Sequence, residues 1–288
     1  MAGATLAEQL DAATTALEAA GLSTARVDAE WLLAGLLGVG RVAARLGLAE
    51  ATPAALAERY AHAVSRRARR EPLQRILGWE EFRGVRVSLT DAVLVPRPET
   101  ETLVEWALAL LPRPGPGRLL AVDVGTGSGC IACALTAERP DLDVVAVDVS
   151  PAAAAVAREN ARALGLAGRV RVVAADLLEG LGDLRADLIV SNPPYLPSDL
   201  VPDLAPEVSA HEPRLALDGG RDGLAVIRRI VGSARRCLRA PGALVVETAG
   251  GPQASAAAAL LRDAGWSGVA VRPDLAGIDR FVAGRAWA

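Results

Sequence analysis

The chain has 288 residues, of which 51% are hydrophobic and 23% charged, and its formal net charge is −3. This length allows about two globular domains, and the hydrophobic content excludes a disordered chain. A slightly acidic protein lacks the concentrated basic surface that captures a nucleic-acid backbone, so we expect no stable nucleic-acid binding.

Residues 1–70 are predicted to form a small helical domain. Leu6, Leu10, Ala13 and Leu17 recur at helical spacing in its first part. Near its end, the run Arg66–Arg70 is strongly basic. Such a run suits either an ordinary solvated helix face or contact with an acidic partner.

Residues 71–98 are predicted to form a linker that contains a β-hairpin. Helical periodicity gives way here to two short β-like runs, Phe82–Val87 and Ala92–Val95. The rigid sequence Pro96–Arg97–Pro98 follows, and it either stiffens the joint or lines a substrate entrance.

Residues 99–288 are predicted to form an α/β domain with a seven-stranded, Rossmann-like sheet. A helix over Glu99–Leu111 precedes a pattern in which strands alternate with a glycine-rich turn and helices, which indicates a parallel sheet covered by helices. The predicted strands are Leu119–Val124, Val144–Asp148, Val170–Ala174, Leu188–Ser191, Ala243–Glu247, Gly268–Arg272 and Arg280–Ala283.

The segment Asp123–Gly129 joins the first of these strands to a helix and contains three alternate glycines. Glycines let the backbone turn sharply and approach a ligand, and free amides at a helix start can meet a carboxylate. A dinucleotide fingerprint would need glycine at Cys130, and a phosphate loop would need a lysine, which this chain lacks entirely. The segment is therefore either a ligand-binding loop of another kind or a purely structural turn.

Two aspartates stand at the ends of the next strands. Asp148 ends the second strand, where its carboxylate can accept both hydroxyls of a ribose. Asp176 follows the third strand and is a candidate for holding the exocyclic amine of adenine. With the glycine segment, they describe a nucleoside pocket without a phosphate cradle.

The fourth strand leads into Asn192–Pro193–Pro194–Tyr195. Two prolines fix the backbone and withhold donors, so the turn presents carbonyls beside the Asn192 amide oxygen and an aromatic ring. The Asn192 oxygen and the Pro193 carbonyl can accept both hydrogens of a planar NH2 group, while Tyr195 lies against its π-face. The alternative is a stiff turn with a buried tyrosine.

Taken together, the glycine segment and the Asn192–Tyr195 turn resemble those of S-adenosylmethionine-dependent methyltransferases that modify planar amino groups. Further sequence along the whole chain resembles the HemK/PrmC family, which methylates the glutamine of the Gly-Gly-Gln loop in class-1 peptide chain release factors. These segments are Glu71–Gly78, Val93–Glu101, Glu212–Gly220 with Asp222–Leu224, and Asp274–Gly277 with Arg280. Three features depart from the pattern usual in the family: Arg75, Leu177 and the segment Glu247–Gly250, which spreads a usual Glu-x-Gly over four residues.

The resemblance implies a class I methyltransferase domain and a role for each matching position. The residues that would bind S-adenosyl-L-methionine are Gly125, Thr126, Gly127, Ser128, Gly129, Asp148, Asp176, Leu177 and Asn192. Asn192, Pro193 and Tyr195 would hold the substrate amide, with Pro194 stiffening the turn. The helical domain, residues 1–70, would bind the release factor.

Three other functions are consistent with the same turn. A near relative would methylate a glutamine of a ribosomal protein, and a nucleic-acid enzyme would methylate an exocyclic amino group of a base. The nucleic-acid enzyme would need a target-recognition domain with a positive groove, which is not apparent in the sequence. A cofactor-binding scaffold without activity is disfavoured because the turn is intact.

Cys130, Cys133 and Cys237 are too few and too unevenly spaced for a disulfide framework. Cys130 and Cys133 also have no further Cys or His nearby to complete a zinc site, so no metal is expected. The chain shows no apolar signal segment and no run near the ~20 apolar residues of a membrane span. We therefore expect a cytoplasmic protein.

Overall fold

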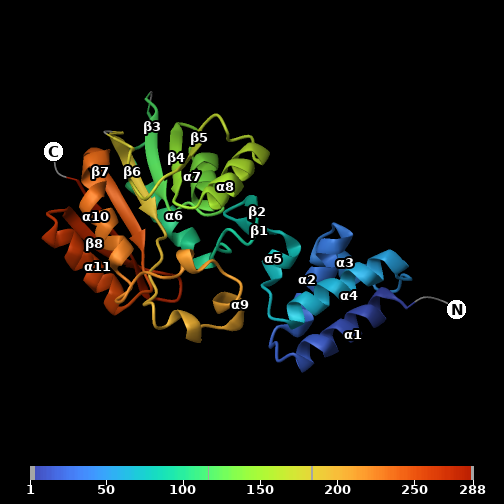
Figure 1. Ribbon diagram of the computed structural model, residues 1–288. Coiled ribbons are helices and arrows are strands. Elements are labelled where there is room, and N and C mark those ends of the chain that lie inside the picture. Colours follow the sequence, from blue (N-terminus) through green and yellow to red (C-terminus); the bar gives the residue numbers. More distant parts are fainter. Residues whose placement is uncertain (1–3, 116, 183, 287–288) are drawn as a thin grey trace. The chain divides into compact units, whose positions relative to one another are not determined.

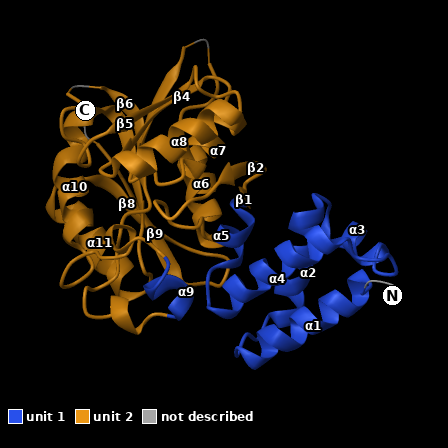
Figure 2. Ribbon diagram, turned by 45° about the vertical axis from the view of Figure 1, so that its right-hand side comes forward, with its two compact units in different colours: residues 1–79, 205–211 blue, residues 80–204, 212–288 orange. Residues whose placement is uncertain are grey.

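The computed structural model describes residues 4–115, 117–182 and 184–286. They divide into two compact units: the described residues within 1–79 and 205–211 form one, and those within 80–204 and 212–288 form the other (Figure 2). The predicted division at residues 1–70, 71–98 and 99–288 stays a proposal, and its two outermost ends lie outside the described residues.

The first unit is helical. Its helices are α1 (Leu6–Ala19), α2 (Ala25–Leu37), α3 (Arg41–Leu46), α4 (Ala54–Ala68), α5 (Leu73–Leu77) and the short α9 (Pro206–Ser209). The apolar positions predicted from the spacing, from Leu6 to Leu17, are buried in its core. Tyr60 is also buried there and donates a hydrogen bond of 2.9 Å to the carbonyl of Ala29.

The basic run Arg66–Arg70 is largely paired inside this unit. Arg67 is buried, and its Nε donates to Asp28 Oδ2 at 2.7 Å. Glu207 of α9 forms ion pairs with Arg67 (3.1 Å) and Arg70 (2.8 Å). Arg67 therefore belongs neither to a solvated helix face nor to a surface for an acidic partner. Its charge is buried, and the carboxylates of Asp28 and Glu207 offset the cost of that burial.

The second unit begins at Glu80, within a hairpin that a helix follows. The hairpin strands are β1 (Trp79–Phe82) and β2 (Val85–Ser88), and α6 (Pro98–Leu110) follows. The expected run Phe82–Val87 is therefore wrong as a single strand, because Arg83 and Gly84 adopt positive φ angles (45° and 75°) and form the turn. Ala92–Val95 is not a strand.

The sheet of this unit has seven strands in the order β5-β4-β3-β6-β7-β9-β8. Strands β3 to β7 pair in parallel, and β9 pairs antiparallel with both β7 and β8. Their bounds are β3 Leu119–Val124, β4 Leu142–Asp148, β5 Val170–Ala174, β6 Ala186–Ser191, β7 Leu238–Glu247, β8 Ser267–Pro273 and β9 Asp279–Arg285. This confirms the predicted fold class, a seven-stranded, Rossmann-like α/β domain.

Helices cover both faces of the sheet (Figure 1). One face packs on α6, α7 (Cys130–Glu138) and α8 (Pro151–Ala163), and the other on α10 (Ala225–Cys237) and α11 (Pro252–Asp263). Alternate residues of one strand enter opposite cores, as Ala121 and Val122 do. The chain order reverses between β3 and β6, so the carboxyl ends of these strands form the edge at which ligands bind in such sheets.

Candidate active site

The glycine segment leaves β3 in a conformation that requires glycine. Gly125, Gly127 and Gly129 have φ angles of 74°, 55° and 81°, which L side chains rarely adopt. The amides of Gly125 and Thr126 donate to the carbonyl of Val147 at 2.8 and 2.9 Å, so the loop is fastened to β4. A fixed backbone then faces the edge of the sheet.

Asp123 holds this loop from inside the protein. Its Oδ2 accepts from Thr126 Oγ1 at 2.6 Å and from the amide of Ala132 at 3.1 Å. Complete burial raises the pKa of Asp123 to about 7, against the opposing effect of these two hydrogen bonds. Thr126 therefore fastens the loop to Asp123, and its predicted contact with the cofactor stays a prediction.

Asp148 lies at the end of β4, as predicted. Its Oδ2 accepts from the amide of Gly127 and its Oδ1 from the amide of Ser150, both at 2.9 Å. Each carboxylate oxygen can accept a further hydrogen bond. The carboxylate is therefore oriented by the backbone while still able to accept two hydroxyl groups.

The segment after β5 combines a charge pair with an unusual backbone. Asp176 Oδ2 accepts from Arg229 Nη2 of α10 at 2.9 Å. Leu177 has a φ of 53°, a left-handed conformation that costs about 1–2 kcal/mol for a residue with a side chain. Strain of this kind persists where surrounding structure enforces it, often at binding sites.

The Asn192–Tyr195 turn leaves β6 beside the glycine segment. Ser191, the last residue of β6, donates from Oγ to the carbonyl of Val124 at 2.7 Å. Asn192 Nδ2 donates to Thr100 Oγ1 at 3.0 Å, and Tyr195 OH lies 3.4 Å from Glu247 Oε1. Burial raises the pKa of Tyr195, so its hydroxyl is a hydrogen-bond donor at neutral pH.

Two segments for which the sequence predicted no role in the site hold the far end of this turn. Leu196 donates to the carbonyl of Leu217 at 3.0 Å and accepts from the amide of Gly219 at 2.8 Å. Gln253 of α11 donates from Nε2 to the carbonyl of Tyr195 at 2.7 Å. The turn is thus fixed at both ends.

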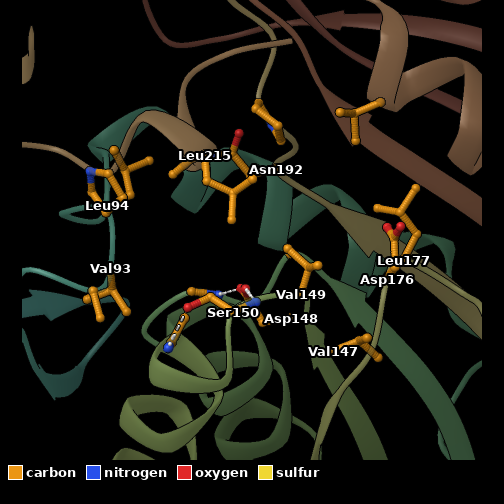
Figure 3. Close-up of a pocket in the computed structure, with 18 of the residues that line it drawn as sticks. Val93, Leu94, Val147, Asp148, Val149, Ser150, Asp176, Leu177, Asn192 and Leu215 are labelled. Carbon is orange, nitrogen blue, oxygen red and sulfur yellow. Dashed lines mark hydrogen bonds between the residues drawn. The ribbon is translucent and has the colours of Figure 1, made fainter. Parts of the chain in front are cut away.

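A cavity of about 300 Å³ lies at this edge of the sheet (Figure 3). The predicted residues that line it are Gly125, Gly127, Asp148, Asp176, Leu177, Asn192 and Pro194. Asn192 and Leu215 lie on one side of it, and Asp148 and Ser150 on the other (Figure 3). The predicted residues that do not line it are Thr126, Ser128, Gly129, Pro193 and Tyr195.

The cavity suits a nucleoside that carries no phosphate. Val147, Val149 and Val226 offer apolar contact for a base, and Asp148 offers acceptors for ribose hydroxyls. Of the described residues that line it, Arg229 alone is basic, and its guanidinium is already paired with Asp176. The residues that line the cavity therefore fit a nucleoside better than a nucleotide.

The two cysteines of α7 take no part in this chemistry. Cys130 and Cys133 are buried, and burial raises the pKa of each to about 12, so both are neutral thiols. Within residues 4–115, 117–182 and 184–286, no group of three or more His, Cys, Asp or Glu side chains could hold a metal ion. No helix in those ranges is long and apolar enough to span a membrane.

Family comparisons match both parts of the chain. Residues 8–78 match the PrmC N-terminal domain, and residues 108–204 match the methyltransferase small domain. The catalytic domain of human Mettl16 in complex with a hairpin of the MAT2A 3′UTR is 18% identical, with a TM-score of 0.59 over 81% of this chain and 82% of that one. At this identity the likeness supports the fold alone.

Full-length relatives are much more similar. The release factor glutamine methyltransferase of Cereibacter sphaeroides is 44% identical over 97% of this chain and 98% of its own. Those of Geobacter sulfurreducens (43%; 98% and 96%) and Mycolicibacterium smegmatis (44%; 95% and 95%) match similarly. The chain therefore belongs to the release factor glutamine methyltransferase family, enzymes of the class I methyltransferase fold that use S-adenosyl-L-methionine.

Proposed function

We propose that this protein methylates the side-chain amide nitrogen of the glutamine in the Gly-Gly-Gln loop of class-1 release factors. One observation carries the proposal: release factor glutamine methyltransferases match this chain from end to end, so the likeness includes both the helical region and the catalytic domain. The Asn192–Tyr195 turn beside a nucleoside cavity supplies the matching chemistry.

The difficulty of this reaction is the weak nucleophilicity of an amide nitrogen, whose lone pair is delocalised into the carbonyl. The amide oxygen of Asn192 and the carbonyl of Pro193 accept its two hydrogens, which favours a pyramidal nitrogen with a localised lone pair. The glycine segment, Asp148, Asp176 and Leu177 would hold S-adenosyl-L-methionine, which would supply an electrophilic methyl group and leave as the neutral thioether S-adenosyl-L-homocysteine. Positioning of this kind lowers barriers by roughly 7–11 kcal/mol.

No general base is required at the site. Asp148 is engaged by two backbone amides and Asp176 by Arg229. The nitrogen loses its proton to water after methyl transfer, when it has become acidic. The Asn192–Tyr195 turn thus acts by orientation and hydrogen bonding.

The function is tested by methylation with a radiolabelled methyl donor. We expect label to enter a class-1 release factor and to be lost when the loop glutamine of that factor is replaced by asparagine. Parallel reactions contain a ribosomal protein fraction and RNA. Equal labelling of the wild-type release factor and of its glutamine-to-asparagine variant would refute the assignment. Preferential transfer of label to RNA would also refute it.

Asp148→Ala is expected to weaken cofactor binding about thirtyfold, because it removes two acceptors for the ribose and releases the amide of Gly127. Isothermal titration calorimetry with the methyl donor measures this effect. Asp143→Ala is the matched control, since Asp143 lies on the same strand but pairs with Arg118, away from the cavity. Equal affinity of the two variants would contradict the ribose role of Asp148.

The helical region, residues 1–70, is proposed to bind the release factor. The support is that this region matches the PrmC N-terminal domain separately from the methyltransferase domain. The proposed place of action is the cytoplasm, where translation termination occurs, and no stable binding to nucleic acid is expected. Photo-crosslinking from surface positions of α1 or α4 to a release factor tests the contact.

A further inference from the structure

The side chain of Asn192 has one end that donates and one that accepts, and only one orientation serves the reaction. An amide turned with Nδ2 toward the substrate would place N–H against N–H. In the structure Nδ2 donates to Thr100 Oγ1 at 3.0 Å. No described residue donates to Oδ1, so the oxygen is available to a substrate amide.

Thr100 fixes that orientation through the direction of its own hydroxyl. Its Oγ1 donates to Glu247 Oε2 at 2.9 Å. A hydroxyl has a single hydrogen, so Thr100 presents only lone pairs to Asn192. A neighbour that offers only lone pairs selects the NH2 end of the amide.

Glu247 in turn fixes the hydroxyl. It ends β7, is 1% exposed, and accepts from Thr100 on one oxygen and from Tyr195 OH on the other. An ionised carboxylate has no hydrogen to donate, so both hydroxyls must point toward it. Glu247 is therefore a single buried acceptor for two residues of the turn, Tyr195 directly and Asn192 through Thr100.

We propose that Glu247 and Thr100 are positioning residues that hold the Asn192 side chain with its oxygen toward the substrate nitrogen. The series runs in one direction: Glu247 accepts from Thr100, Thr100 accepts from Asn192, and Asn192 accepts from the substrate. This inference rests on the proposed function, in which Asn192 accepts a hydrogen of the glutamine amide.

Thr100→Val removes the hydroxyl at nearly constant volume and is the first test. We expect kcat to fall about tenfold or more, because the amide loses the acceptor that selects its orientation. KM for the release factor and Kd for the methyl donor are expected to change less than about threefold. Thr100→Ser restores the hydroxyl and is expected to recover most of kcat.

Thr136→Val is the matched control for the loss of a buried threonine hydroxyl. Thr136 is also fully buried, but its hydroxyl donates to the carbonyl of Ala132 within α7. The kcat of the Thr136→Val enzyme is expected to stay near that of the wild type. A direct readout is hydrogen exchange of the Asn192 side-chain NH2, followed by NMR, which is expected to be faster in Thr100→Val than in Thr136→Val.

The pH dependence of kcat is a second test. Burial raises the pKa of Glu247 to about 7, although Thr100 and Arg280 of β9 favour the charged form; Glu99 and Tyr195 also face this carboxyl. Only the ionised form orders the hydroxyls, so kcat is expected to rise as pH increases through about 7. Glu247→Gln cannot titrate, and its kcat is expected to be lower and to lack this rise.

The results separate this inference from the proposed function. If the wild-type enzyme labels no release factor, the proposed function fails. If it labels the factor but Thr100→Val and Thr136→Val share its kcat and exchange rate, the function stands and the positioning role is wrong. A rise with pH that persists in Glu247→Gln would also overturn the role of Glu247.

Discussion

Asn192→Ala is expected to lower kcat for release factor methylation about a thousandfold, the largest effect of any single substitution at this site. The side-chain oxygen is a fixed acceptor for the reacting amide, and loss of one preorganised hydrogen-bonding group costs about 10²–10³ in kcat. Single-turnover methylation with labelled cofactor measures the loss.

The control for Asn192→Ala is cofactor affinity. Asn192 is one of many residues that line the cavity, so Kd for the methyl donor is expected to rise only a few-fold. Asn192→Asp is a less suitable variant, because it keeps an acceptor but places a charge near the cofactor. An Asn192→Ala enzyme that retained more than about a tenth of wild-type kcat would show that other groups position the substrate amide.

The parts of the site that sequence predicted are those determined by local geometry. A glycine segment between a strand and a helix, and aspartates at the ends of parallel strands, meet at one edge because the topology brings those ends together. Asp148 and the glycine segment are accordingly found where they were expected. Their proposed contacts with cofactor remain predictions.

The residues that were missed act over long distances in the sequence. Thr100 and Asn192 are 92 residues apart, and Thr100 and Glu247 are 147 apart. Hydrophobic periodicity indicates which positions are buried but not which partners meet. One signal was present: Glu247 is a carboxylate directly after the apolar run Ala243–Val246, and a buried charge requires a partner.

The long segment after the Asn192–Tyr195 turn shows a similar limit. The weak periodicity of residues 193–221 is typical of a functional or a disordered loop, and it does not indicate that residues 205–211 belong to the helical unit. Glu207 lies 140 residues from Arg67, with which it pairs. A charge in a loop has many possible partners in the sequence, so only the folded chain identifies the one used.

Gly219→Ala is expected to lower kcat about a hundredfold, although Gly219 contributes no side chain to the reaction. A Cβ at this position would lie 2.7 Å from the carbonyl oxygen of Gly223 and 2.8 Å from both Pro194 O and Tyr195 Cα. These are backbone atoms, so the methyl group must displace the turn itself, and a shift of about 1 Å at a reacting centre can cost 10²-fold.

The matched control for this substitution is Gly168→Ala, since a Cβ at Gly168 meets no atom within 4 Å. Overpacking at Gly219 is also expected to lower the free energy of unfolding by about 1–3 kcal/mol, measured by urea denaturation, whereas Gly168→Ala leaves it nearly unchanged. Activity can be lost through unfolding or through displacement of the Asn192–Tyr195 turn. Cofactor affinity separates these two causes, because a folded Gly219→Ala enzyme keeps the contact between Asp148 and Gly127. A folded variant with wild-type kcat would show that methyl transfer tolerates movement of the Asn192–Tyr195 turn, contrary to the orientation mechanism.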